Sequence, residues 1–301
     1  KSHDFEERFF FGLSRMPCTF LDADDYIHGS TEKLREVLPL IAEKEYTFLA
    51  IVNSPGASLI GDDLKRFITD ARLSDRCMAC EGAAYSRPFS EGFDEAVVSS
   101  LQWLRLNHLS KVKTRVNLLG FSMIQKYWQG NISEIVRTCE LMGLSVVAVP
   151  GAGSPVAELR ESTSASCNLV VYPEYCRKTA EFYQHAFGIP AVYSPGGVPI
   201  GFGPTETWIR TVAEATGADP KHALEDLRKK RMQAYHQLAR CSDEDCYKKS
   251  ARFSIRGDTS LVLSLTTWLY EYLGMHPVSL SFLDGKDPEI EKQVSDYIIR
   301  N

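Results

Sequence analysis

Long hydrophobic runs and an excess of positive charge are both missing from this sequence. No apolar stretch reaches the roughly 18 residues that a membrane-spanning helix requires. The formal net charge is −5, which does not support nucleic-acid binding, because that function requires a basic face. We therefore expect neither a membrane nor a nucleic acid among the partners of this protein.

Cysteine is too sparse for a disulfide scaffold, with eight residues among 301. No secretion signal is visible at the start, so we expect a reducing, cytoplasmic compartment. Cys77 and Cys80 have the Cys-x-x-Cys spacing of a metal site or a redox pair, but no second close pair of that kind completes a zinc site. The alternative is structural, because Met78 and Ala79 extend a strand through this pair.

The dinucleotide-binding fingerprint Gly-x-Gly-x-x-Gly is also missing. The loop 150–155 follows an expected strand, and the backbone N–H groups around Gly151 and Gly153 could hold an anion there. A second loop, 194–204, is rich in glycine and proline and includes Gly197. Loops of that length are often functional, so both loops are candidate binding sites.

Strands alternate with helices along the whole sequence, which predicts an α/β fold of repeated Rossmann-like domains with parallel sheets. We expect a first domain at 1–112, a second at 113–217, a long connecting helix within 218–250 and the start of a third domain at 251–301. The first residue is not Met, and a helix expected at 288–299 opens an unfinished crossover. We therefore expect the sequence to be a piece of a longer chain.

The stretch Leu49–Asp63 is the one around which the first domain is organised. Its pattern predicts a strand at 48–52, a turn of small residues at 53–56, and a helix that opens at 59–63 and runs on through Ile68. Ligands in parallel sheets bind at the carboxyl ends of strands, where this turn lies. An ordinary connection without a ligand fits the same pattern.

The sequence from about Pro17 to Phe282 resembles component 1 of the nitrogenase family. That family comprises molybdenum–iron protein subunits, their cofactor-assembly paralogues and the dark-operative protochlorophyllide reductase subunits. The stretches that carry the resemblance are Leu59-Ile-Gly-Asp-Asp63; Cys80-Glu-Gly82 with Glu91-Gly92; Glu140-Leu-Met-Gly-Leu144 with Gly188-Ile-Pro190 and Gly203-Pro-Thr205; and Arg252-Phe-Ser-Ile-Arg-Gly-Asp258 with Leu273-Gly-Met275-His-Pro277.

The resemblance implies three Rossmann-like domains in a full subunit and a paired, pseudo-symmetric assembly with a homologous component 1 subunit. It also implies an iron–sulfur cluster at the subunit interface, supplied with electrons by an ATP-dependent iron-protein reductase. Cys18 follows a proline-containing turn at a family cluster position and is the best candidate ligand. Another family cysteine is replaced by Pro55, or by Ser54 if the gap is placed differently, and Cys80 matches a cysteine that is usually not a ligand.

The set of ligands for a molybdenum–iron cofactor is absent by the same comparison. Tyr172 stands where the catalytic subunit has its cofactor cysteine, and Cys176 lies past the strand end. The cofactor histidine corresponds to Phe93 or Asp94. Iron in such a site needs a thiolate, so the sequence resembles beta-type or assembly-type members most.

Two functions are consistent with this resemblance, and a third is less specific. The first is an oxidoreductase subunit that relays electrons through an interface cluster to an unknown substrate, held at the strand ends near Tyr172, Gly151–Gly153 and 195–203. The second is a non-catalytic scaffold on which a metallocofactor is assembled or carried. The third is a relative that binds a small molecule without metal.

Overall fold

The computed structural model describes residues 19, 21–42, 46–82, 87–240, 251–283, 292 and 295–296. The chain divides into two compact units, Lys1–Pro88 with Val98–Arg105 and Phe89–Val97 with Leu106–Asn301. Helix α6 (Phe89–Trp103) contributes residues to both units.

The first unit contains two parallel strands, paired from Leu49↔Cys77 to Val52↔Cys80. Helices α3 and α5 pack apolar side chains against them, so that Leu34, Ile68 and Cys77 share one core. The elements of this unit before α6 are α2 (Ala23–His28), α3 (Thr31–Ala42), β1 (Leu49–Val52), α4 (Pro55–Ile60), α5 (Leu64–Asp70) and β2 (Cys77–Cys80).

The helix predicted to open at 59–63 and run through Ile68 is wrong, because two helices replace it. Gly61 has a left-handed backbone (φ 79°) and ends α4. Asp63 then caps α5 by accepting the N–H of Arg66 at 3.0 Å. Asp62 accepts both the N–H (2.8 Å) and the hydroxyl (2.5 Å) of Ser30. Within this unit, the Gly-Asp-Asp sequence therefore ends one helix, starts the next and holds the beginning of α3.

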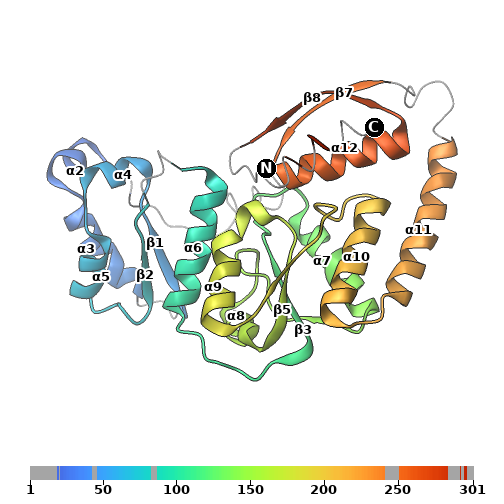
Figure 1. Cartoon of the computed structure of the whole chain (residues 1–301). Coiled ribbons are helices and arrows are strands. Elements are labelled where there is room, and N and C mark those ends of the chain that lie inside the picture. Colours follow the sequence, from blue (N-terminus) through green and yellow to red (C-terminus); the bar gives the residue numbers. More distant parts are fainter. Residues whose placement is uncertain are drawn as a thin grey trace. The chain divides into compact units, whose positions relative to one another are not determined.

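The second unit is built on a parallel four-stranded sheet in the order β4-β3-β5-β6. Figure 1 shows α9 on one side of this sheet and α7 and α10 on the other. The elements are β3 (Val112–Leu119), α7 (Trp128–Leu141), β4 (Ser145–Val146), α8 (Val156–Glu161), η1 (Ser162–Ser164), β5 (Ala165–Val170), η2 (Pro173–Tyr175), α9 (Arg177–Phe187), β6 (Ala191–Tyr193), α10 (Phe202–Thr216) and α11 (Lys221–Arg240).

The two central strands are buried almost continuously over their second halves, from Val116 to Leu119 and from Cys167 to Val170. Such burial is expected where helices cover both faces of a parallel sheet. Trp208 and Ile209 of α10 join the same core. The predicted α/β fold with parallel, Rossmann-like sheets is confirmed.

Two strand predictions around this sheet were wrong in their bounds. The strand expected at 144–149 is only two residues long, although the N–H of Val147 still donates to the carbonyl of Val116 at 2.8 Å. The strand expected at 168–172 begins at Ala165 and ends at Val170, so Tyr172 lies beyond its carboxyl end. The helix predicted from Lys221 to Arg240 is confirmed.

A last strand–helix–strand segment completes the described part of the second unit: β7 (Arg252–Gly257), α12 (Thr259–Leu273) and β8 (His276–Phe282). The two strands are parallel and pair from Arg252↔His276 to Gly257↔Phe282. The helix expected at 288–299 lies almost entirely outside the described residues, and the four-segment division of the chain stays a prediction. Among the helices of the described residues, none combines the length and apolar character needed to cross a bilayer.

Replacing Gly120 by alanine should destabilise the second unit. Gly120 has φ 94°, and an added Cβ would lie 2.3 Å from the backbone oxygen of Tyr172. Both the strained backbone and the overlap oppose a side chain, so we expect a loss of roughly 2–4 kcal/mol in the free energy of unfolding. Urea denaturation measures this loss.

Gly130→Ala is the matched control, because Gly130 lies in α7 and an added Cβ there meets no atom within 4 Å. We expect this variant to be neutral or more stable by about 0.5–1 kcal/mol, because alanine favours the helix. Equal stability of the Gly120→Ala variant and the wild type would contradict the close packing of the two strand ends.

Candidate functional site

The carboxyl ends of β3 and β5 form the topological switch point of the central sheet. After β3 the chain leaves for β4 on one side, and it returns for β5 and β6 on the other. Ligands of open parallel sheets bind in the crevice at such a point. Here Gly120 follows β3 and lies against the backbone of Tyr172, which follows β5.

Tyr172 provides the functional side chain at this point. It is 6% exposed, and its ring meets that of Phe121 edge-on at 5.4 Å between centroids. Burial raises the pKa of Tyr172 to about 12, and the neighbouring carboxyl groups of Asp258 and Glu174 add to the shift. Its hydroxyl makes no hydrogen bond with any residue that the structure describes. Because buried polar groups are normally paired, a bound molecule would supply the missing partner.

Glu174 binds the beginning of α12. Its carboxyl oxygens accept the N–H of Ser260 at 2.5 Å and the hydroxyl of Ser260 at 2.9 Å. The first N–H groups of a helix have no partner inside the helix, so Glu174 performs a capping function from another part of the chain. Burial raises the pKa of Glu174.

Asp258 occupies the N-cap position of α12 but makes no capping hydrogen bond. Its carboxyl group instead accepts the hydroxyl of Tyr175 at 3.1 Å. Burial raises the pKa of Asp258, although the Tyr175 hydrogen bond opposes the shift. A carboxyl group that keeps its proton to higher pH can donate it to a substrate that takes up electrons. The site therefore combines an unpaired phenol with a candidate acid.

Asp94 of α6 caps α9 in the same way. Its carboxyl oxygens accept the N–H of Lys178 at 2.6 Å and the N–H of Thr179 at 3.0 Å. Asp94 is 3% exposed, and burial raises the pKa of this carboxyl group. One turn of α6 also brings the ring of Phe93 to 5.9 Å from that of Tyr175, so the side of the site near Tyr175 is aromatic.

The three predicted glycines pack against three different neighbours rather than around one ligand. An added Cβ at Gly151 would lie 2.5 Å from the ring of Phe93, and one at Gly153 would lie 3.1 Å from Trp128. One at Gly197 would lie 2.9 Å from the hydroxyl of Ser264 on α12. Each glycine allows a close approach of the backbone, and the structure does not bring them together with Tyr172 by direct contact.

The predicted metal ligand Cys18 lies outside the described residues. Within the described ranges, no group of three histidine, cysteine or acidic side chains could hold a metal ion. Cys176 lies at the start of α9, fully buried, and burial raises the pKa of its thiol well above the ordinary value. Cys139 and Cys167 are core residues, as predicted.

A doubly wound parallel sheet with a polar site at its switch point defines the Rossmann-like class of α/β proteins. Residues 3–298 match the family described as nitrogenase component 1 type oxidoreductase. The chain belongs to that family, which confirms the resemblance that its sequence motifs indicate.

Relatives with curated names include one of the subunits of light-independent protochlorophyllide reductase, from two organisms. The protein of Chlorobium phaeovibrioides is 24% identical over 95% of this chain and 53% of its own length. That of Synechococcus sp. (strain CC9311) is 28% identical over 88% of this chain and 53% of its own length. The chain thus spans about half the length of these relatives.

The fold is also similar to a solved structure titled "Nitrogenase Cp1 at pH 6.5". The TM-score is 0.74 at 16% sequence identity, with 94% of this chain and 64% of the other covered. This likeness supports the fold alone.

Sequence reasoning identified Tyr172 but did not identify the roles of Glu174, Asp258 and Asp94. Asp258 had a recognisable signal, because an aspartate between a strand and a helix is a candidate cap. Glu174 had none, because its partner Ser260 is 86 residues away in the sequence.

Replacing Asp258 by asparagine should change how stability depends on pH. Burial places the pKa of Asp258 in the folded protein above that in the unfolded chain, which is about 3.9. Its contribution to stability is therefore complete below the unfolded pKa and is lost as pH rises through the folded pKa. Asparagine stays neutral, so the Asp258→Asn variant should gain stability relative to the wild type between mildly acidic and neutral pH, as measured by urea denaturation.

Tyr175→Phe is the companion variant, because the Tyr175 hydroxyl lowers the pKa of Asp258. Without this hydroxyl, the loss of stability should move to higher pH. Parallel pH profiles of the wild type and Asp258→Asn would contradict the assignment of a raised pKa to Asp258.

Proposed function

We propose that this chain is part of a nitrogenase-like oxidoreductase subunit that reduces a substrate bound at the switch point of the central sheet. The observation that carries this proposal is the hydroxyl of the buried Tyr172 side chain, which has no partner among the described residues. Asp258 lies beyond it in the same site and supplies a carboxyl group with a raised pKa. Family membership supplies the reaction class.

Electrons would reach this substrate through an iron–sulfur cluster shared with a homologous component 1 subunit, and an ATP-dependent iron-protein reductase would supply them. Protochlorophyllide is the first substrate to test, because it appears in the names of the relatives. The described cysteines are all free thiols, which suits the proposed cytoplasmic location.

The residues at the strand end do not fit a metal cofactor. Tyr172 offers a phenol whose pKa is about 12, and Cys176 is enclosed with its thiol hydrogen-bonded to the carbonyl of Tyr172 at 3.4 Å. Neither group supplies an accessible thiolate, which iron in such a site requires. The interface cluster would therefore depend on Cys18, with further ligands outside the described residues or from the partner subunit.

A non-catalytic scaffold for metallocofactor assembly or carriage is the second candidate. Burial raises the pKa of the Cys77 and Cys80 thiols, and Pro55 begins α4 where a family ligand is expected. A chain with few available thiolates would hold a metal cluster only in transit. This observation favours the scaffold over permanent cluster binding.

Iron analysis of the full-length protein with its partner subunit, purified without oxygen, separates these functions. For the oxidoreductase we expect bound iron and sulfide with visible absorbance that dithionite reduces. Cys18→Ala should lose most of this iron, because the variant lacks the proposed thiolate ligand.

Cys80→Ala is the matched control, since Cys80 is a half-buried strand cysteine, and it should keep its iron. Wild-type protein that contains no iron when its partner is present would exclude the electron relay. Iron that passes to another protein without turnover of any substrate would favour the scaffold.

A further inference from the structure

A cavity of ≈520 Å³ lies between α7, α10, α11 and α12 of the second unit. None of its lining residues belongs to the site around Tyr172. Small-molecule sites commonly have volumes of about 300–1,000 Å³, so this cavity is large enough for a ligand of two or three fused rings.

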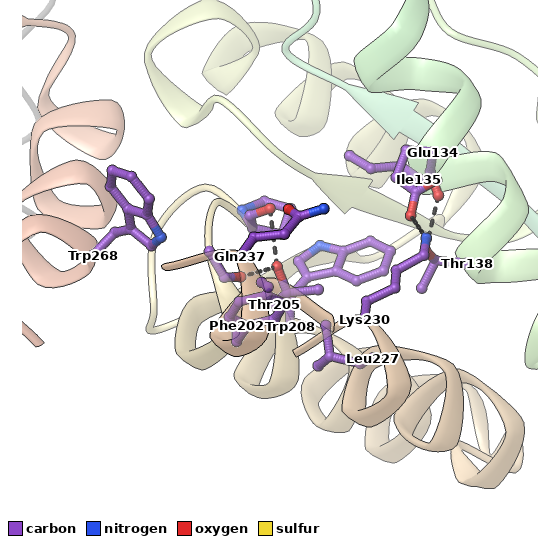
Figure 2. A pocket seen from close by; sticks show the side chains of 13 residues that line it. Glu134, Ile135, Thr138, Phe202, Thr205, Trp208, Leu227, Lys230, Gln237 and Trp268 are labelled. Carbon is purple, nitrogen blue, oxygen red and sulfur yellow. Dashed lines mark hydrogen bonds and ion pairs between the residues drawn. The ribbon is translucent and has the colours of Figure 1, made fainter. Parts of the chain in front are cut away.

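The walls of the cavity are mainly apolar and aromatic. Figure 2 shows Trp268 of α12 at one end, residues of α7 at the other and the ring of Trp208 between them. Phe202 and Leu227 complete the apolar lining. An elongated space between flat rings favours a flat, apolar ligand.

Trp208 supplies the observation that points to a ligand. The side chain is 2% exposed, yet its indole N–H makes no hydrogen bond with any residue in the described part of the chain. Indole is a donor only, and buried donors normally have an acceptor. A ligand with a carbonyl-type oxygen would satisfy this donor from inside the cavity.

The charged groups at the α7 end already neutralise each other. Lys230 forms ion pairs with Glu134 at 2.6 Å and with Asp226 at 3.4 Å. Arg137 pairs with the same two carboxylates. These four charges sum to zero, so the ligand needs no charge of its own.

We propose that this cavity binds a flat, uncharged, apolar molecule that accepts a hydrogen bond from the indole N–H of Trp208. The site is separate from the reducing site, and its existence does not depend on electron relay. Its ligand is recognised by shape, by aromatic contact and by one carbonyl-type acceptor.

The fluorophore Prodan, a naphthalene that carries a ketone, is a suitable probe, because its emission reports both polarity and hydrogen bonding to the ketone. Titration into the full-length wild-type protein should give saturable binding with emission at shorter wavelength than in water. Trp208→Phe keeps the apolar ring but removes the donor. It should weaken binding about fivefold to tenfold, as expected for loss of one hydrogen bond, and shift the bound emission to still shorter wavelength.

Trp268→Phe is the matched control, because it changes the other indole of the cavity and leaves the Trp208 donor in place. Its bound emission should equal that of the wild type. Ala234→Phe adds a ring inside the cavity and should weaken binding at least tenfold. If thermal unfolding shows that this variant does not fold, Ala234→Leu replaces it with the same expected direction.

Three results would overturn the proposal. The first is the absence of saturable binding to the wild type. The second is wild-type affinity in the folded variant with a larger residue at Ala234, which would place the probe elsewhere. The third is a Trp208→Phe variant with unchanged affinity and emission, which would show that the indole donor does not bind the ketone.

Discussion

The hydrogen bonds from Ser260 to Glu174 are the constraint on which the arrangement of the switch-point site depends. They attach the beginning of α12 to the segment that follows β5. Because Glu174 caps the helix, Asp258 is released from the capping role that its position predicts and binds Tyr175 instead. Burying a carboxyl group is costly unless it is well hydrogen-bonded, and a buried donor left without its acceptor costs about 1–3 kcal/mol. The two groups therefore hold each other in place.

The same arrangement recurs in both units of the chain. Asp94 of α6 caps α9, and Asp62 accepts both donors of Ser30 before α3. In each case a carboxyl group that is distant in sequence satisfies donors at a helix beginning. This gives the Gly-Asp-Asp motif of the first unit a structural explanation, and it leaves the unpaired hydroxyl of Tyr172 as the more specific indication of a ligand.

Much of the fold could be predicted from the sequence, because buried strands and amphipathic helices leave local patterns. The helix Lys221–Arg240 and the strand pair of the first unit follow from such patterns. The family could also be predicted, because its motifs are short and specific. The capping carboxyl groups could not, since Glu174 and Ser260 are 86 residues apart and no local pattern encodes a tertiary contact. The helix break at Gly61 was missed because an apolar run continues on both sides of it.

Amide hydrogen exchange at Ser260 tests the central claim most directly, namely that Glu174 caps α12 and thereby shapes the site. N–H groups in the first turn of an uncapped helix have no internal partner and exchange readily. The account predicts that the Ser260 amide is protected as strongly as the interior amides of α12, and that this protection is lost in a Glu174→Ala variant while the interior of the helix stays protected. Rapid exchange at Ser260 in the wild-type protein would contradict it.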